Sequence, residues 1–155
     1  MSNDVIQIQH TLAACCHYVD RGTADQVATL FAPEAVLMPY YDGKYEVRGR
    51  EAIRGWFTFY HENLRAKVTD LKHLTHSMMI DVDGDAASSV CYLTAYFTSK
   101  EDNVAHQVIG TYYDELVSGD DVWLFQERRI EVQYLTPLAH VIDNMEPMGY
   151  PGATN

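Results

Sequence analysis

The sequence has little positive charge and no long hydrophobic run. Its 155 residues include 22 acidic and 11 basic side chains, so the formal net charge is −11. Such a surface repels phosphate backbones and anionic lipid heads, which argues against nucleic-acid and membrane partners. No apolar run approaches the roughly 20 residues that a membrane-spanning helix needs. The first residues also lack the basic start and apolar block of a signal peptide. We therefore expect a cytoplasmic protein.

Several motifs of common chemistry are also absent. The three cysteines, Cys15, Cys16 and Cys91, are an odd number with two adjacent, which favours neither a disulfide framework nor a C-x-x-C metal site. The chain contains no G-x-x-x-x-G-K-[ST] or G-x-G-x-x-G phosphate loop and no G-x-S-x-G nucleophile elbow. These absences disfavour nucleotide-dependent chemistry and serine hydrolysis, and we expect neither a cofactor nor a metal.

The first part of the chain has helical periodicity. Apolar residues at helical spacing predict a first helix that ends at Gly22. A second helix is predicted to begin at Thr23, with Gln26 in the capping-box position, and to end before Pro33. A third helix is predicted over about residues 50–63.

The second part alternates as strands do. Four long strands are predicted over residues 72–82, 86–98, 104–117 and 122–134. The dipeptide Asp42-Gly43 predicts a turn between two earlier, shorter strands. Helices followed by an antiparallel meander indicate an α+β fold with the helices on one side of a sheet. We expect one domain over residues 1–135 and an irregular tail over residues 136–155 that covers a pocket or a neighbouring subunit.

Three ionisable residues occupy positions where the pattern predicts apolar ones. His76 is next on the strand face that carries Met78 and the apolar residues after it. Arg128 lies on the inner face of the last strand, where an unpaired charge is costly. Asp20 lies beside the apolar stripe of the first helix, in its last turn, where the helix dipole disfavours an acid.

Each of these residues also has a structural interpretation. His76 would be a hydrogen-bonded core residue, Arg128 half of an ion pair, and Asp20 a cap or a partner of Arg21. Their joint occurrence favours a cooperative interpretation. Asp20 would fix the tautomer of His76 so that the imidazole acts as a base. Arg128 would stabilise the negative charge that develops on a leaving group or enolate.

The chain resembles the SnoaL-like group of the nuclear transport factor 2-like superfamily over almost its whole length. The resemblance rests on the segments YVDRGTADQVATLFAPEAVL, VRGREAIRGWF and GDDVWLFQERRIEVQYLTPLA. It implies a cone-shaped, cystatin-like α+β barrel, in which a curved mixed sheet surrounds a cavity closed by N-terminal helices. It also implies a homodimer or homotrimer, and we expect Trp123 and Phe125 on an exposed convex face of the kind that forms interfaces.

Within this group the chain is most similar to the branch of scytalone dehydratase, hexachlorocyclohexane dehydrochlorinase and bile-acid 7α-dehydratase. The resemblance places the Asp–His dyad of that branch on Asp20 and His76, and the dehydrochlorinase arginine on Arg128. Cys15 and Val19 stand where these relatives carry lysine or tyrosine, so the residues that bind the leaving group or a carbonyl differ. The candidate substrate-binding residues are Tyr40, Tyr96, Tyr112, Cys15, Val19 and Met78.

The resemblance implies a cofactor-independent lyase or isomerase of the dehydratase type, acting on a small apolar, cyclic substrate. Two alternatives remain open from the sequence. One is a non-catalytic small-molecule binder or accessory subunit, and the other is a polyketide cyclase.

Overall fold

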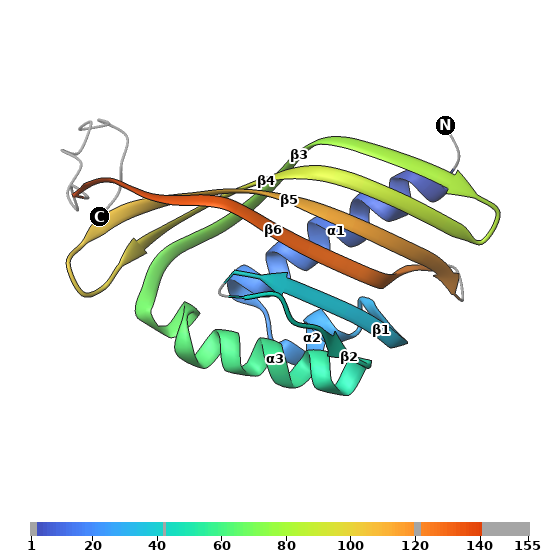
Figure 1. Cartoon of the computed structure of the whole chain (residues 1–155), viewed down its shortest axis with the longest axis horizontal. Helices are drawn as coiled ribbons and strands as arrows, with labels where there is room; N and C mark the ends of the chain where they lie inside the picture. The colour runs from blue at the N-terminus through green and yellow to red at the C-terminus, as the bar shows by residue number, and fades with distance from the viewer. Residues whose placement is uncertain (1–2, 42, 120–121, 141–155) are drawn as a thin grey trace, which may run out of the picture.

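A computed structural model describes residues 3–41, 43–119 and 122–140 of the chain (Figure 1). The helices in these ranges are α1 (Asn3–Arg21), α2 (Ala24–Ala28), α3 (Arg50–Asn63) and the 3-10 helix η1 (Arg65–Lys67). The strands are β1 (Phe31–Tyr40), β2 (Val47–Arg48), β3 (Val68–Asp83), β4 (Ala86–Ser99), β5 (Val104–Gly119) and β6 (Val122–His140). No helix in the described part of the chain is long and apolar enough to cross a membrane.

The strands form one curved, mixed sheet in the order β2-β1-β6-β5-β4-β3. The pair β1–β6 is parallel and all other neighbours are antiparallel. The sheet remains open, with β2 and β3 as its edges, and α1 lies across one of its faces (Figure 1). The core lies between that face and the helices, where Leu12 of α1 and Phe125 of β6 are fully buried. The expected α+β architecture is therefore confirmed, with a sheet that curves without closing.

The helix predictions are confirmed except for one boundary. Helix α1 ends at Arg21, directly before Gly22, and α3 covers the predicted range. The capping box of α2 is present, with the Gln26 N–H donating to Thr23 Oγ1 at 3.1 Å. Helix α2 nevertheless ends at Ala28, because the chain from Phe31 onward pairs with β6. Long-range strand pairing thus overrides the local helical pattern.

The four long strands are confirmed, and the last one is longer than predicted. Strand β6 pairs with β5 as far as His140, opposite Val104. Residues 136–140 are therefore strand rather than the beginning of the expected tail. The rest of that tail, residues 141–155, and Asp42 of the predicted turn lie outside the described residues.

A β-bulge in β6 reverses the predicted exposure of its aromatic residues. Glu115 pairs with Glu127 and Leu116 with Phe125, so β6 has one extra residue at this point. A bulge of this kind shifts the alternation by one residue, so the side chains before it lie on the opposite face from the one predicted by the residues after it. Trp123 and Phe125 are only 2% and 0% exposed, so the expectation that they form an exposed convex face is wrong.

Candidate active site

The histidine of β3 that lines a cavity is His73, and not the predicted His76. Ser77 has a φ angle of 52° and lies in a bulge where β3 has one residue more than β4. Because the bulge interrupts the alternation of side chains, His76 falls on the exposed face. Its Nε2 lies 3.0 Å from Thr94 Oγ1. Before the bulge, Leu71 and His73 are the residues of β3 that line the cavity.

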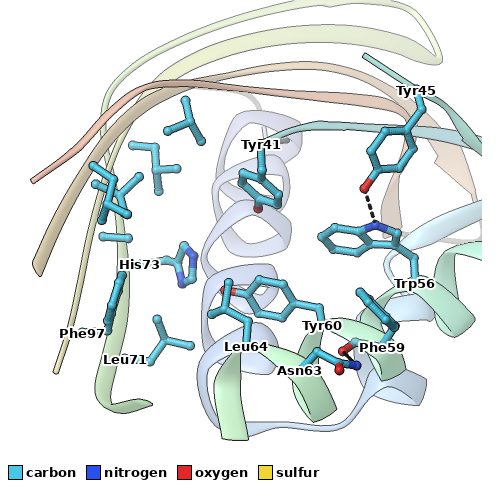
Figure 2. A pocket seen from close by; sticks show the side chains of 15 residues that line it. Tyr41, Tyr45, Trp56, Phe59, Tyr60, Asn63, Leu64, Leu71, His73 and Phe97 are labelled. Atoms are coloured by element: carbon cyan, nitrogen blue, oxygen red, sulfur yellow. Dashed lines mark hydrogen bonds between the residues drawn. The ribbon is translucent and has the colours of Figure 1, made fainter. Parts of the chain in front are cut away.

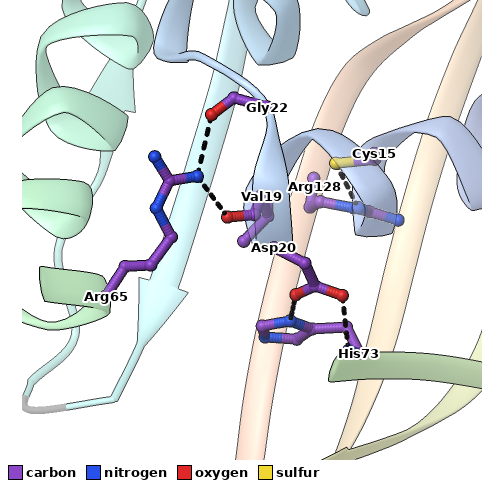
Figure 3. A network of polar contacts seen from close by, with 7 residues as sticks. All are labelled: Cys15, Val19, Asp20, Gly22, Arg65, His73 and Arg128. Atoms are coloured by element: carbon purple, nitrogen blue, oxygen red, sulfur yellow. Dashed lines mark hydrogen bonds and ion pairs between the residues drawn. The ribbon is translucent and has the colours of Figure 1, made fainter. Parts of the chain in front are cut away.

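Asp20 of α1 holds His73 through both carboxylate oxygens (Figure 3). Asp20 Oδ1 lies 2.5 Å from His73 Nδ1, and Asp20 Oδ2 accepts the backbone N–H of His73 at 2.9 Å. The side chains of His73 and Asp20 are 8% and 11% exposed. The predicted dyad of Asp20 with His76 is therefore corrected to a pair of Asp20 with His73.

The contact with Asp20 determines the tautomer of the His73 imidazole. With Nδ1 facing a carboxylate, we assign the proton to Nδ1, which leaves the Nε2 lone pair as an acceptor. The structure gives Nε2 no hydrogen-bond partner within residues 3–41, 43–119 and 122–140. In Figure 2 the imidazole lies on the wall of a cavity and faces the rings of Tyr41 and Tyr60. His73 thus lines the cavity with one ring nitrogen bound to a carboxylate and the other available as an acceptor.

The cavity has a volume of about 400 Å³ and two walls of different character. One wall, from α3 and the segment after β1, is formed by Tyr41, Tyr45, Trp56, Phe59 and Tyr60. The opposite wall, from strands β3 to β6, includes Leu71, Leu93, Ala95, Phe97, Val108, Val132 and Leu135. Its size falls in the usual range of ligand pockets, about 300–1,000 Å³. Among the described residues of this lining, His73 is the only titratable one besides tyrosines, so the cavity suits an uncharged, mostly apolar molecule.

The aromatic wall is held together by contacts among its own members. Trp56 Nε1–H donates to the hydroxyl of Tyr45 at 3.0 Å. The Trp56 ring stacks on Tyr41 and on Tyr60, with centroid distances of 6.0 and 5.5 Å. These contacts fix Tyr60 opposite His73 (Figure 2). Burial raises the pKa of Tyr60, so its hydroxyl stays protonated and can act as a donor.

A second, much smaller chamber lies behind His73. Its volume of about 10 Å³ is close to the space of one water molecule. It shares Tyr41, Tyr60 and His73 with the larger cavity. The rest of its lining is Cys15, Cys16, Val19, Phe57, Tyr112, Arg128 and Ile130. The sequence-predicted residues Cys15, Val19, Tyr112 and Arg128 therefore meet in this chamber.

Arg128 is on the inner face of β6, as predicted, and is 2% exposed. Its Nε and Nη2 groups donate to the two carboxylate oxygens of Asp114 at 2.7 and 2.8 Å. Its Nη1 donates to Cys15 Sγ at 3.2 Å (Figure 3). The guanidinium lies 4.3 Å from the ring centroid of Tyr112 and 4.0 Å from that of Phe125. Arg128 is thus half of a buried ion pair and also part of the chamber wall.

Three predicted binding residues lie elsewhere. Tyr40, Tyr96 and Met78 are absent from the lining of both cavities. Tyr96 lies on the opposite side of β4 from the lining residues Ala95 and Phe97, and its hydroxyl accepts Gln107 Nε2–H at 3.0 Å. Met78 packs against the hydrophobic core.

Several residues of the site were not predicted from the sequence. These are His73, Asp114, Trp56 and Tyr60. Asp114 had a usable signal, since it is an acid at an inward position between Tyr112 and Leu116 of an apolar strand. His73 had none, because only the bulge after it determines its face.

The three thiols should be unreactive in the folded protein. Cys15, Cys16 and Cys91 are 2%, 8% and 0% exposed. Burial raises the pKa of Cys16 to about 12 and that of Cys91 to about 11, and it also raises the pKa of Cys15. Because the thiolate is the reactive species, we expect a thiol-disulfide colorimetric reagent at pH 8 to modify almost none of them, and all three in urea. Rapid modification of the native protein would contradict this burial.

Comparisons with known proteins agree with this fold. Residues 1–129 match the SnoaL-like domain. No curated protein shows a significant match. A solved structure named as an aromatic ring hydroxylase from Novosphingobium aromaticivorans is 25% identical, with a TM-score of 0.73 over 87% of this chain and 93% of that one.

Two further solved structures are more distant in sequence. A hexachlorocyclohexane dehydrochlorinase, LinA type 2, is 19% identical, with a TM-score of 0.73 over 94% of this chain and 95% of that one. A structure named as a scytalone dehydratase from N. aromaticivorans is 18% identical, with a TM-score of 0.74 over 94% and 93% of the two chains. At these identities the likeness establishes the fold, and the domain match establishes the family. The chain belongs to the SnoaL-like domain family.

Proposed function

We propose that this protein is a cofactor-independent lyase or isomerase of the dehydratase type, acting on a small, uncharged, cyclic molecule. The observation that carries the proposal is the Asp20–His73 pair, whose free imidazole nitrogen opens onto an apolar cavity. An oriented imidazole contributes roughly 10²–10⁴-fold to a reaction that begins with proton transfer. An apolar cavity alone would serve a binding protein equally well, but a paired, mostly buried histidine would not be needed there.

The reaction begins with proton abstraction from carbon. His73 Nε2 takes the proton, and the electron pair of the C–H bond forms a new double bond as the neighbouring C–O bond breaks. The imidazolium, stabilised by Asp20 at Nδ1, then returns the proton to the departing hydroxyl group, so that the net change is the loss of one water molecule. An isomerase would use the same base and return the proton to another carbon.

The small chamber supports water as the leaving group. It adjoins His73, it has room for about one water molecule, and its wall includes Arg128 and Tyr112. Burial raises the pKa of Tyr112, which keeps its hydroxyl protonated as a donor. Chloride is larger than water and would find less room there, so we favour dehydration over the loss of chloride.

The function can be tested by isotope exchange, which does not require the natural substrate. A panel of cyclic β-hydroxy ketones is incubated with the protein in D₂O and followed by mass spectrometry and NMR. We expect loss of water, or deuterium uptake next to the carbonyl, for at least one compound. Compounds that bind in the cavity, as measured by quenching of Trp56 fluorescence, but never exchange or react would contradict the proposal. That result would favour a non-catalytic binder.

A further inference from the structure

The end of α1 is held by an arginine from another part of the chain. The last carbonyl groups of an α-helix have no partners within the helix. Arg65 Nη1 donates to two carbonyls at this end, that of Val19 at 3.1 Å and that of Gly22 at 2.8 Å (Figure 3). A cation at this position also interacts favourably with the negative end of the helix dipole. Arg65 therefore fixes the backbone on both sides of Asp20.

Arg65 and His73 hold the same helix end from one continuous segment. Arg65 begins η1, which leads directly into β3, and β3 carries His73. Arg65 donates hydrogen bonds to the backbone carbonyls that flank Asp20. The backbone N–H and the imidazole of His73 bind the Asp20 carboxylate. In the described part of the chain, no acidic side chain forms an ion pair with Arg65. Its contacts are thus directed at the helix end and not at a salt bridge of its own.

We propose that Arg65 is a positioning residue for the Asp20–His73 pair. Its guanidinium keeps the last turn of α1 at the distance from β3 that the carboxylate–imidazole contact requires. Without it, the helix end would fray, as helix ends do when their carbonyls lose their partners. Asp20 would then spend part of the time away from His73 Nδ1. The consequence for catalysis rests on the function proposed above, whereas the positioning itself can be measured without a substrate.

A matched control is available in Arg50. Arg50 Nε also donates to a backbone carbonyl, that of Phe31 at 2.7 Å, and the contact is part-buried like those of Arg65. It joins the start of α3 to the start of β1, however, and does not involve α1. The variants Arg65→Met and Arg50→Met each lose an arginine contact to the backbone, but only the first should disturb Asp20.

The test is proton NMR of the His73 Nδ1–H group. A short imidazole–carboxylate hydrogen bond gives a far-downfield resonance, which can be assigned by its loss in His73→Gln. We expect this resonance in the native protein and in Arg50→Met, and its loss or a clear upfield shift in Arg65→Met. Arg65→Lys keeps the charge with a different donor geometry and should give an intermediate result. This milder variant also keeps the test informative if Arg65→Met does not fold.

Two outcomes would overturn the proposal. One is an unchanged resonance in folded Arg65→Met, and the other is an equal loss in Arg50→Met, which would indicate general loosening. If a substrate is found, turnover should fall by up to roughly 100-fold in Arg65→Met, as for other small misplacements of catalytic groups. If the resonance responds as expected but the native protein turns over no compound, the proposed function fails and the positioning role of Arg65 stands.

Discussion

Replacing His73 by alanine should lower turnover by a factor of about 10²–10⁴. The variant removes the proposed base, and among the described residues the rest of the cavity lining offers only tyrosines as titratable groups. The thermal midpoint should also fall, because the variant leaves the mostly buried Asp20 carboxylate without its imidazole partner, so turnover is compared well below both midpoints. Steady-state kinetics on an active compound, with thermal unfolding followed by circular dichroism, measure both quantities.

His76 provides the matched control for this experiment. It lies three positions further along β3 but on the exposed face, where its Nε2 lies 3.0 Å from Thr94 Oγ1 and its ring packs edge-on against Tyr92. His76→Ala should therefore keep nearly native turnover. Asp20→Asn should behave like His73→Ala, since an amide does not stabilise an imidazolium as a carboxylate does. Loss of activity in His76→Ala together with full activity in His73→Ala would disprove the assignment of the base.

Asp114→Asn should destabilise the fold by about 3–5 kcal/mol, the usual cost of removing one partner of a buried ion pair. The side chains of Arg128 and Asp114 are 2% and 0% exposed and share two hydrogen bonds. The amide would leave the guanidinium without a counter-charge at a side chain that is only 2% exposed. Urea unfolding, analysed for the change in midpoint at constant slope, gives the free-energy difference.

Two comparisons isolate the buried charge as the cause. The double variant Asp114→Leu with Arg128→Met removes both charges and should recover much of the lost stability, as apolar replacements of buried pairs often do. The exposed pair Arg54–Glu51, at 3.1 Å with side chains 45% and 80% exposed, serves as the control. Glu51→Gln should cost less than about 1 kcal/mol. A small effect of Asp114→Asn would mean that Arg128 is not held as described.

Periodicity alone was sufficient for most of the secondary structure. The first and third helices and the four long strands all follow from the spacing of apolar residues, and the Thr23–Gln26 capping box follows from local chemistry. The inward position of Arg128 was also predictable, because the alternation in β6 holds from the bulge onward. Its partner was not predicted, since Asp114 and Arg128 meet only through the register of β5 and β6.

Which histidine meets Asp20, and is therefore the proposed base, depended on a shift of one residue in strand register. His73 and His76 are both separated from Asp20 by more than 50 positions, and both lie in a strand that alternates. The bulge at Ser77 shifts that alternation by one residue, which places His76 outside and leaves His73 opposite Asp20. Nothing in the side-chain pattern marks a serine as the extra residue of a bulge.

The sequence by itself determined the family, the α+β architecture and the positions of Asp20 and Arg128 beside apolar residues, whereas its assignment of the histidine was wrong. These properties depend on composition and on the spacing of residues within single helices and strands, which can be read from the chain without knowing how its segments pack. The tertiary structure alone decided which histidine meets Asp20, which acid neutralises Arg128, and how Arg65 holds the end of α1. Each of these depends on strand register and helix placement, which are set by contacts between segments far apart in the chain.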